Sequence, residues 1–178
     1  MRVIAGTRKG HRLASPRGAH VRLTGDRVRE AIFNLVGPVD GTSVLDLFAG
    51  SGALGIEALS RGAGRCVFAE SDRGAVRVIR ENLERTRLTG AVVEQRDVIA
   101  LLREERSRGR SYDLVICDPP YGRWAEMEAP LAELLPGVLS PDGLLMVETD
   151  ERVEPQLPLD PVTSRRYGSA RVTIFRHA

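Results

Sequence analysis

The sequence has few cysteines, few aromatic residues and no long apolar run, and each scarcity argues against a class of protein. Its two cysteines, Cys66 and Cys117, both lie in apolar, strand-like runs, which indicates neither a disulfide framework nor a paired-cysteine metal site. No apolar run approaches about 18 residues, the length of a membrane-spanning helix, and the first residues do not resemble a signal peptide. We therefore expect a soluble, cytoplasmic protein that uses neither a metal nor a membrane.

Charge is small in total but uneven along the chain. The formal net charge is +2, yet residues 1–29 carry eight bases against one acid, Asp26. The bases are Arg2, Arg8, Lys9, Arg12, Arg17, Arg22, Arg27 and Arg29. Such a segment favours an anionic partner. The 178 residues fit one domain plus a small appendage, which we place at 23–178 and 1–22 respectively.

The amino-terminal part predicts a small hairpin followed by a helix. Strand-like pieces at 2–6 and 12–13 flank a turn rich in glycine and basic residues, which is typical of a β-hairpin outside the main sheet. Thr24 is an N-cap candidate for a helix over 26–36. The apolar face of that helix is predicted to hold Val28, Ala31, Ile32 and Leu35.

From residue 43 onward, strand and helix patterns alternate with short connections. Strands are predicted at 43–48, 65–70, 91–95, 112–117 and 144–149, and helices near 53–61, 72–86, 97–107 and 123–135. This alternation predicts an α/β fold with a mostly parallel, doubly wound sheet. Two further runs, 162–167 and 171–176, leave no room for a crossover helix between them. They predict an antiparallel hairpin that completes a seven-stranded, Rossmann-like sheet.

The most distinctive motif is Asp118-Pro119-Pro120-Tyr121, which follows the apolar run 112–117. Two prolines cannot extend a β-ladder, so the strand is predicted to end there, at the carboxyl edge where ligands of open α/β sheets bind. The motif offers a carboxylate, backbone carbonyls with no competing N–H at either proline, and an aromatic ring. This combination suits a planar group that carries an exocyclic amine. A tight turn with an incidental Asp and Tyr is the structural alternative.

A second motif, from Asp46 to Gly55, joins the first predicted strand to the following helix and contains a GxGxxG pattern. Within it Phe48, Gly50 and Gly52 are predicted to lie against a ligand, because glycines allow a tight turn and close approach. A nicotinamide or flavin dinucleotide would use the same features for its pyrophosphate. Asp46 favours another ligand, since a carboxylate at the strand end attracts a cation and disfavours a pyrophosphate.

Two more acids follow the next two strands. Glu70 ends the second strand, a position from which a carboxylate accepts both hydroxyls of a ribose. Asp97 follows the third strand and is a candidate acceptor for an adenine amine. Each acid also has a structural interpretation, as a helix N-cap or a solvated loop charge. S-adenosylmethionine, which carries an ammonium, a sulfonium and a carboxylate, suits this set of residues.

With these motifs the sequence resembles the class I S-adenosylmethionine-dependent methyltransferases and, more narrowly, the RsmD family over nearly the whole chain. The shared stretches are 2–6, 10–13, 24–34, 46–63 and 118–121. The specific part is Asp26-Arg27-Val28-Arg29-Glu30 with Phe33-Asn34, since many amino-methyltransferases share the other motifs. Leu23 and Gly25 depart from the family, which usually has Pro and then Thr or Ser there.

The resemblance implies a substrate and a chemistry. It implies methylation of the exocyclic N2 of a guanine of 16S rRNA, position 966 in the usual rRNA count, with S-adenosylhomocysteine as the product. Asp118 and the Pro119 carbonyl are then expected to accept from the amine hydrogens, while Tyr121 stacks on the base. The partner is expected to be 16S rRNA in the small ribosomal subunit or an assembly intermediate, bound by a monomer.

Aromatic residues make up only 4% of the chain, so few of them can stack on RNA bases. Trp124 follows the Asp118 motif but is expected to cover the cofactor or to fill the core. RNA affinity is therefore expected from phosphate contacts, which dominate nucleic-acid binding. The candidates are Arg8, Lys9, Arg12, Arg27 and Arg29. In relatives the amino-terminal hairpin is thought to contact RNA; for the last two arginines, a solvated, salt-bridged helix face is the alternative.

Other functions stay open on the sequence alone. An N6-adenine DNA methyltransferase or a glutamine methyltransferase can use the same Asp118 motif, although the chain has no room for a separate DNA target-recognition domain. A non-catalytic RNA-binding assembly factor could share the fold, because fold does not fix function. A dinucleotide oxidoreductase is disfavoured by Asp46 and by the Asp118 motif.

Overall fold

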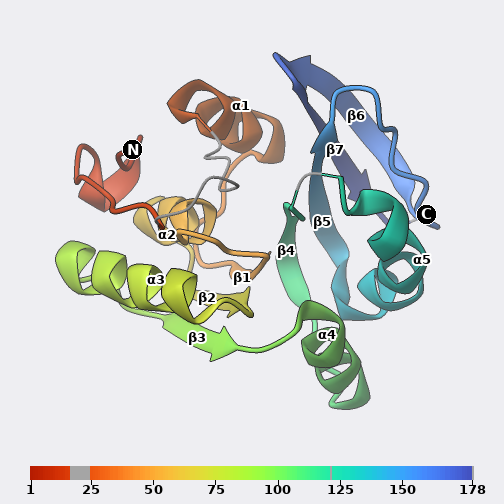
Figure 1. Cartoon of the computed structure of the whole chain (residues 1–178), viewed down its shortest axis with the longest axis horizontal. Coiled ribbons are helices and arrows are strands. Elements are labelled where there is room, and N and C mark those ends of the chain that lie inside the picture. Colours follow the sequence, from red (N-terminus) through yellow and green to blue (C-terminus); the bar gives the residue numbers. More distant parts are fainter. Residues whose placement is uncertain (17–24, 121, 178) are drawn as a thin grey trace.

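The computed structural model describes residues 1–16, 25–120 and 122–177, which form a seven-stranded sheet between layers of helices (Figure 1). The strands are β1 (Ser43–Leu47), β2 (Arg65–Glu70), β3 (Ala91–Gln95), β4 (Tyr112–Cys117), β5 (Leu139–Asp150), β6 (Asp160–Tyr167) and β7 (Ala170–Arg176). The helices are α1 (Asp26–Val36), α2 (Ala53–Ser60), α3 (Arg73–Thr86), α4 (Val98–Ser107) and α5 (Trp124–Leu134), with 3-10 turns η1 (Gly6–Arg8) and η2 (Leu135–Val138).

The sheet has the order β3-β2-β1-β4-β5-β7-β6. Strands β1 to β5 pair in parallel, whereas β7 runs antiparallel to β5 and to β6. The predicted parallel sheet with a carboxyl-terminal hairpin is confirmed. Strand β5 begins five residues before the predicted run at 144–149, at Leu139, which pairs with Tyr112 across an irregularity in the ladder. The strand order reverses between β1 and β4, and open α/β sheets bind ligands beyond the carboxyl ends at such a point.

Two apolar layers, one on each face of the sheet, hold the helices in place. Ile32 of α1, Ile56 of α2 and Ile79 of α3 belong to one layer, while Leu101 of α4 and Leu131 of α5 belong to the other. Successive side chains of a strand point to opposite faces, so each buried strand contributes to both layers. Within the described residues, no helix is long and apolar enough to cross a membrane.

The predicted amino-terminal hairpin is wrong. Residues 1–16, which we call the N-terminal segment, form a single antiparallel bridge between Arg2 and Arg12 around the turn η1. The ladder stops because the backbone N–H groups of Ile4 and Ala5 donate to the buried Glu57 carboxylate of α2, at 2.8 and 3.0 Å, instead of to a second strand. The segment therefore docks on the domain; it does not stand apart as a hairpin.

Helix α1 occupies the predicted range but buries a different face. Its N-cap residue is Gly25, whereas the predicted cap, Thr24, lies outside the described residues. The buried positions are Arg29, Ile32 and Phe33, so of the predicted apolar face only Ile32 is fully buried. The buried face is rotated because the Phe33 ring packs under the guanidinium of Arg61, the residue that follows α2, 4.7 Å from the ring centre. Arg29 on the same face reaches the N-terminal segment.

Candidate active site

The register of the central strands brings three predicted site residues to one edge of the sheet. Leu47 at the end of β1 pairs with Ala69 of β2 and with Cys117 of β4. Phe48, Glu70 and Asp118 each come one residue later and therefore lie abreast at the carboxyl edge. Neighbouring strands are about 4.8 Å apart, so Glu70 and Asp118 stand roughly 10 Å from each other across the end of β1.

The glycine loop, residues 48–52, turns sharply away from the end of β1. Phe48 has a φ of 59°, Gly50 of 57° and Gly52 of 76°. A positive φ costs little for glycine but is unusual for phenylalanine, and such strain is concentrated at ligand sites. A Cβ on Gly50 would meet only the Phe48 carbonyl oxygen, at 3.8 Å, so the Gly50 backbone is open to close approach by a ligand.

Glu70 holds this loop against the end of β2. One carboxylate oxygen accepts the Gly50 N–H at 2.9 Å and the other accepts the Asp72 N–H at 2.8 Å. The side chain is half-buried. Each carboxylate oxygen has two acceptor sites, so both oxygens retain capacity for a hydroxyl donor. The predicted ribose acceptor thus also fixes the glycine loop.

Asp46 lies beneath the loop and faces α2. Its side chain is buried, and one oxygen accepts the Gly55 N–H at 2.9 Å, in the first turn of α2. Burial raises the pKa of Asp46 to about 7; the Gly55 hydrogen bond opposes this shift and the Glu70 charge adds to it. A buried carboxyl group with a pKa near 7 becomes fully charged when a cation approaches.

Gly55 explains how Asp46 and α2 come so close. A Cβ at Gly55 would lie 2.3 Å from the Phe68 ring and 2.7 Å from the Cys66 sulfur. Only glycine therefore lets α2 pack this tightly on β2, and that packing brings the Gly55 N–H within reach of Asp46.

The raised pKa of Asp46 leads to a prediction about stability. The pKa of Asp46 is higher in the folded protein than the ordinary value of 3.8. The contribution of Asp46 to the free energy of unfolding is therefore complete at low pH and is lost as the pH rises to about 7. Each pKa unit corresponds to about 1.4 kcal/mol. In the absence of cofactor, Asp46→Asn should therefore gain stability relative to the wild type between pH 4 and 7 in thermal unfolding curves.

Asp113→Asn provides a control of opposite sign. Hydrogen bonds from the Ser43 N–H, followed by the Ser43 and Ser140 hydroxyls, lower the pKa of Asp113 despite partial desolvation. Its stabilisation is present above the ordinary pKa and is lost as the pH falls. A constant difference between Asp46→Asn and the wild type at every pH would contradict the assignment.

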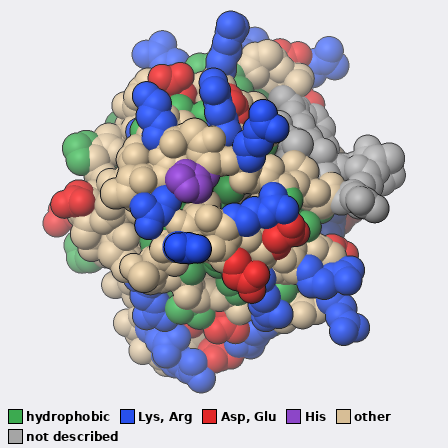
Figure 2. Space-filling model, turned by 90° about the vertical axis from the view of Figure 1, so that its left-hand side faces the viewer, with side chains coloured by type: hydrophobic (Ala, Val, Ile, Leu, Met, Phe, Trp, Pro, Cys, Tyr) green, Lys and Arg blue, Asp and Glu red, His purple; other side chains and the backbone are tan. Residues whose placement is uncertain are grey.

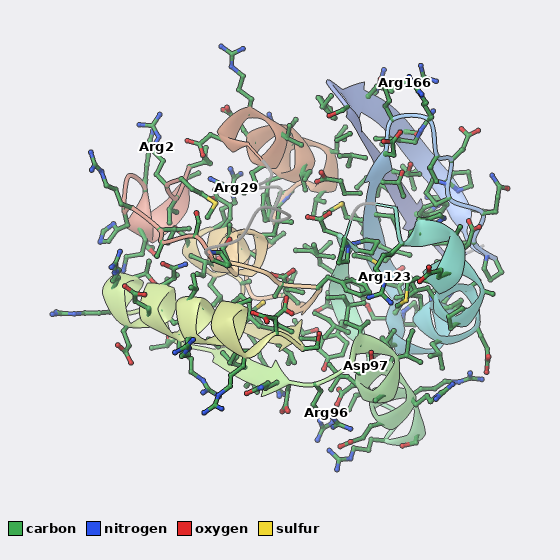
Figure 3. All side chains as sticks on the ribbon, in the orientation of Figure 1. Arg2, Arg29, Arg96, Asp97, Arg123 and Arg166 are labelled. Atoms are coloured by element: carbon green, nitrogen blue, oxygen red, sulfur yellow. The ribbon has the colours of Figure 1, made fainter. Side chains whose placement is uncertain are left out.

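Asp97 occupies a structural position. It is the N-cap residue of α4, and its carboxylate accepts the Ala100 N–H at 3.0 Å (Figure 3). The side chain is exposed beyond the end of β3. Of the two interpretations of Asp97, the structure displays the N-cap, and contact with an adenine amine stays a prediction.

The Asp118 motif follows β4 as expected. Asp118 is half-buried and Pro119 is buried, while the exposed Pro120 accepts the Arg123 N–H through its carbonyl oxygen at 3.1 Å. Tyr121, the predicted stacking residue, lies outside the described residues. Trp124 fills the core between α5 and the sheet, and its Nε1 donates to Glu128 at 2.9 Å. Core filling is one of the two roles expected for it.

Of the five predicted RNA contacts, four have exposed side-chain surface and Arg29 is buried. Lys9, Arg12 and Arg27 are exposed, and Arg8 is half-buried, with its Nε donating to the Thr86 carbonyl. Figure 2 shows the side of the molecule that carries the N-terminal segment, with basic side chains spread over it.

Arg29 does not fit the role of a phosphate contact. Its side chain has no exposed surface and donates to Asp26 at 2.8 Å and to the Arg2 carbonyl (Figure 3). Burial lowers its pKa, and the neighbouring carboxylates of Asp26 and Glu57 oppose the shift. Arg29 therefore fastens α1 to the N-terminal segment.

Two buried polar residues that the sequence analysis missed link the site to the N-terminal segment. Asn82 of α3 accepts the Ala14 N–H at 2.7 Å and donates to the carbonyls of Ala14 and of Ser51 in the glycine loop, both at 3.0 Å. Glu57 accepts from Ile4 and Ala5, as described above, and pairs with Arg61 at 2.8 Å. Asn82 and Glu57 each interrupt the apolar face of their helix. A polar residue at such a position was the sequence signal that could have identified them as buried hydrogen-bonding residues.

No group of three or more His, Cys, Asp or Glu side chains that could hold a metal ion occurs within the described ranges. The site consists of carboxylates, glycine backbone and prolines at one sheet edge. This strand order and this edge define a class I S-adenosylmethionine-dependent methyltransferase fold.

Comparison with known proteins assigns the chain within that class. It belongs to the family described as Conserved hypothetical protein 95, whose model matches residues 1–176. The chain is 40% identical over 186 residues to a Bacillus subtilis (strain 168) protein named "Putative rRNA methyltransferase YlbH", covering 99% of this chain and 98% of that protein. It is 37% identical over 164 residues to "Ribosomal RNA small subunit methyltransferase D" of Escherichia coli (strain K12), covering 90% and 79%.

Solved structures show the same architecture. That of yhhF from Escherichia coli superposes with a TM-score of 0.83 at 30% identity, covering 100% of this chain and 98% of that one. A hypothetical protein of Thermus thermphillus superposes with a TM-score of 0.85 at 33% identity, covering 99% of both chains.

Proposed function

We propose that this protein methylates the exocyclic N2 of a guanine of 16S rRNA, with S-adenosylmethionine as the methyl donor. The observation that carries the proposal is the placement of Glu70, Phe48 and Asp118 abreast at the carboxyl edge, in a chain 37% identical to a small-subunit rRNA methyltransferase. Glu70 serves the cofactor subsite and Asp118 serves the acceptor subsite.

The residues on the β1 and β2 side suit the cofactor. The Gly50 backbone leaves open a surface that any side chain would fill, and both Glu70 oxygens can accept from ribose hydroxyls. Asp46 supplies a buried negative charge below the loop. When bound, the cofactor supplies an activated methyl group on a positively charged sulfur. The chain's own residues orient it and keep water from it.

The residues that follow β4 suit the acceptor. The lone pair of a guanine N2 is delocalised into the ring, so the nitrogen is a weak nucleophile. Hydrogen bonds from its two N–H groups to the Asp118 carboxylate and the Pro119 carbonyl would draw the amine toward a tetrahedral shape and free that lone pair. We assign Tyr121 the stacking role that holds the base in plane. Positioning of this kind accounts for large rate effects without a further catalyst.

An RNA substrate suits the approach to the site. A base must be unpaired or turned out of its helix to reach Asp118, which is easiest in an RNA loop. The exposed Lys9, Arg12 and Arg27, together with Arg8, provide contacts for the phosphates around that loop. We propose 16S rRNA in the small subunit or its assembly intermediate as the partner.

The basic N-terminal segment can be tested only by point substitution. Val3 and Leu13 are buried in the core, and Glu57 and Asn82 bond to the segment, so its removal would unfold part of the domain. Lys9→Gln with Arg12→Gln removes two exposed charges instead. The slope of log affinity for 16S rRNA against log salt should then shrink by about 0.7 for each single-strand phosphate that the variant no longer binds. If the plots of log affinity against log salt coincide for variant and wild type, these residues do not belong to the RNA interface.

A transfer assay with labelled S-adenosylmethionine tests the proposed function against its alternatives. Naked 16S rRNA, small subunits lacking the modification, duplex DNA and ribosomal protein are offered separately. Label in RNA alone is the expected result. Label in DNA adenine or protein glutamine would favour the other amine methyltransferases, and no label in any substrate would favour an assembly factor.

A further inference from the structure

We infer that helix α3 carries a second RNA-binding surface, a row of arginines that follows the RNA away from the active site. The inference rests on the proposed function, since it names a further surface for the same substrate. The row consists of Arg73, Arg77 and Arg80 of α3 and Arg87 at its carboxyl-terminal end, all four exposed.

Helix geometry places these arginines on one face. At 3.6 residues per turn, their positions fall within about 80° around the helix axis. The opposite face holds the buried residues Ala75, Ile79, Asn82 and Thr86, which fix α3 against the sheet and the N-terminal segment, and the buried Val76 lies at the border between that face and the row. The arginine row is therefore directed outward, away from the domain.

The row runs from the carboxyl edge of the sheet, where the active site lies, to the N-terminal segment that is assigned to RNA. Arg73 is three residues beyond Glu70 at the carboxyl edge, and Arg87 lies about 21 Å further along the helix. Next to Arg87, the Thr86 carbonyl accepts from Arg8 of η1, which brings the N-terminal segment to that end of the row. Figure 1 shows the N-terminal segment beside α2 and α3, and Figure 2 shows basic side chains on that side of the molecule.

The charge pattern is unfavourable for the helix itself. Arg73 is the first residue of α3 and the first turn contains no acid, although cations near a helix N-terminus oppose the helix dipole. Only the N-cap Asp72 offsets it there. Arg77 follows Arg73 by four residues and precedes Arg80 by three, spacings at which like charges repel.

Acidic neighbours do not neutralise the row. In the part of the chain that the structure describes, Arg73, Arg77, Arg80 and Arg87 form no ion pair, while Glu81 pairs with Arg85 on the flank of the helix. Glu84 is the one acid within the row. Among the described residues these arginines form no ion pairs, and their charges destabilise their own helix. They therefore suit binding to successive phosphates of an RNA strand.

The test compares two triple variants that remove equal charge. Arg73→Gln, Arg77→Gln and Arg80→Gln remove the row, and Arg103→Gln, Arg106→Gln and Arg108→Gln remove three exposed arginines in and just after α4, on the opposite face of the sheet. Binding of unmodified 16S rRNA is measured across a salt series, alongside affinity for S-adenosylhomocysteine and the melting temperature.

The α3 variant should keep its melting temperature and cofactor affinity. Its salt slope should shrink by about 2, which at 0.1 M salt corresponds to roughly 100-fold weaker binding. The α4 variant should match the wild type. Equal slopes for the α3 variant and the wild type, or equal losses in both variants, would overturn the inference. If the triple variant unfolds, Arg77→Gln alone should lower the slope by about 0.7, and no change there would overturn it.

Methyl transfer separates this inference from the function on which it rests. The α3 variant should show a raised KM for RNA with kcat unchanged, because the row lies outside the acceptor subsite. Absence of transfer to rRNA by the wild type would refute the proposed function itself. Transfer by the wild type with an unchanged KM in the α3 variant would refute only the arginine row.

Discussion

Replacing Asp118 with alanine should lower the rate of methyl transfer in a single turnover by about 10²–10³ and leave the affinity for S-adenosylhomocysteine nearly unchanged. The rate should fall because the amine loses the acceptor that draws it out of the plane of the base. Affinity should persist because Asp118 follows β4, whereas the glycine loop and Glu70 follow β1 and β2.

Asp113→Ala is the matched control, since it removes a carboxylate from the opposite end of the same strand. Asp113 bonds to Ser43 and Ser140, far from the carboxyl edge. Rapid-quench assays at saturating RNA and calorimetric titration with S-adenosylhomocysteine measure the two quantities. Equal losses of rate and affinity in Asp118→Ala would refute its assignment to the acceptor subsite.

Replacing Glu70 with alanine should have the reverse effect. Affinity for S-adenosylhomocysteine should fall by about 1–3 kcal/mol, roughly 5- to 150-fold, because the ribose hydroxyls lose their acceptor. The N–H groups of Gly50 and Asp72 lose theirs as well, so the glycine loop should also become less well held. Saturating cofactor should restore a substantial part of the rate.

Glu70→Gln separates the two roles of this residue. The amide keeps one oxygen that can accept from Gly50 or Asp72, so the loop should be better held than in the alanine variant, and the affinity should lie between those of the alanine variant and the wild type. Isothermal titration of both variants with S-adenosylhomocysteine gives the comparison. A rate that stays low at saturating cofactor would show that Glu70 acts beyond cofactor binding.

The alternating part of the chain was predictable because local signals agree with the tertiary structure there. Residues 65–70, 91–95 and 112–117 form strands with the predicted bounds, since each is a short apolar run between clear turns. The sheet edge then follows from the ends of these strands, which is why Glu70 and Asp118 could be placed from the sequence.

The amino-terminal part was less predictable because distant residues decide its structure. A Cβ on Gly6 would lie 1.7 Å from the Ser60 carbonyl oxygen, and Ile4 and Ala5 donate to Glu57, more than 50 residues away. The local pattern indicated a hairpin, but these contacts pull the strand out of the ladder. Arg29 was misassigned for the same reason, since its partner carbonyl on Arg2 is brought to it only by the docked segment.

The positions of Glu70 and Asp118 at the carboxyl edge could be predicted, but the hydrogen bonds within the candidate site could not. A strand pattern cannot indicate that Glu70 bonds to Gly50 or that Asn82 reaches Ser51, because both contacts depend on how the glycine loop turns. The Gly55 contact of Asp46 depends equally on how closely α2 packs on β2. These contacts determine how the glycine loop and the cofactor subsite are held.

Identification of the methylated atom separates methylation of guanine N2 from every alternative. Small subunits lacking the modification, and naked 16S rRNA, are incubated with the protein and labelled S-adenosylmethionine, and the RNA is digested to nucleosides for mass spectrometry and mapped by primer extension. We expect N2-methylguanosine at a single guanine with the wild type, and very little with Asp118→Ala. A methyl group on an adenine, on a ribose or on guanine at another atom would contradict the proposed function.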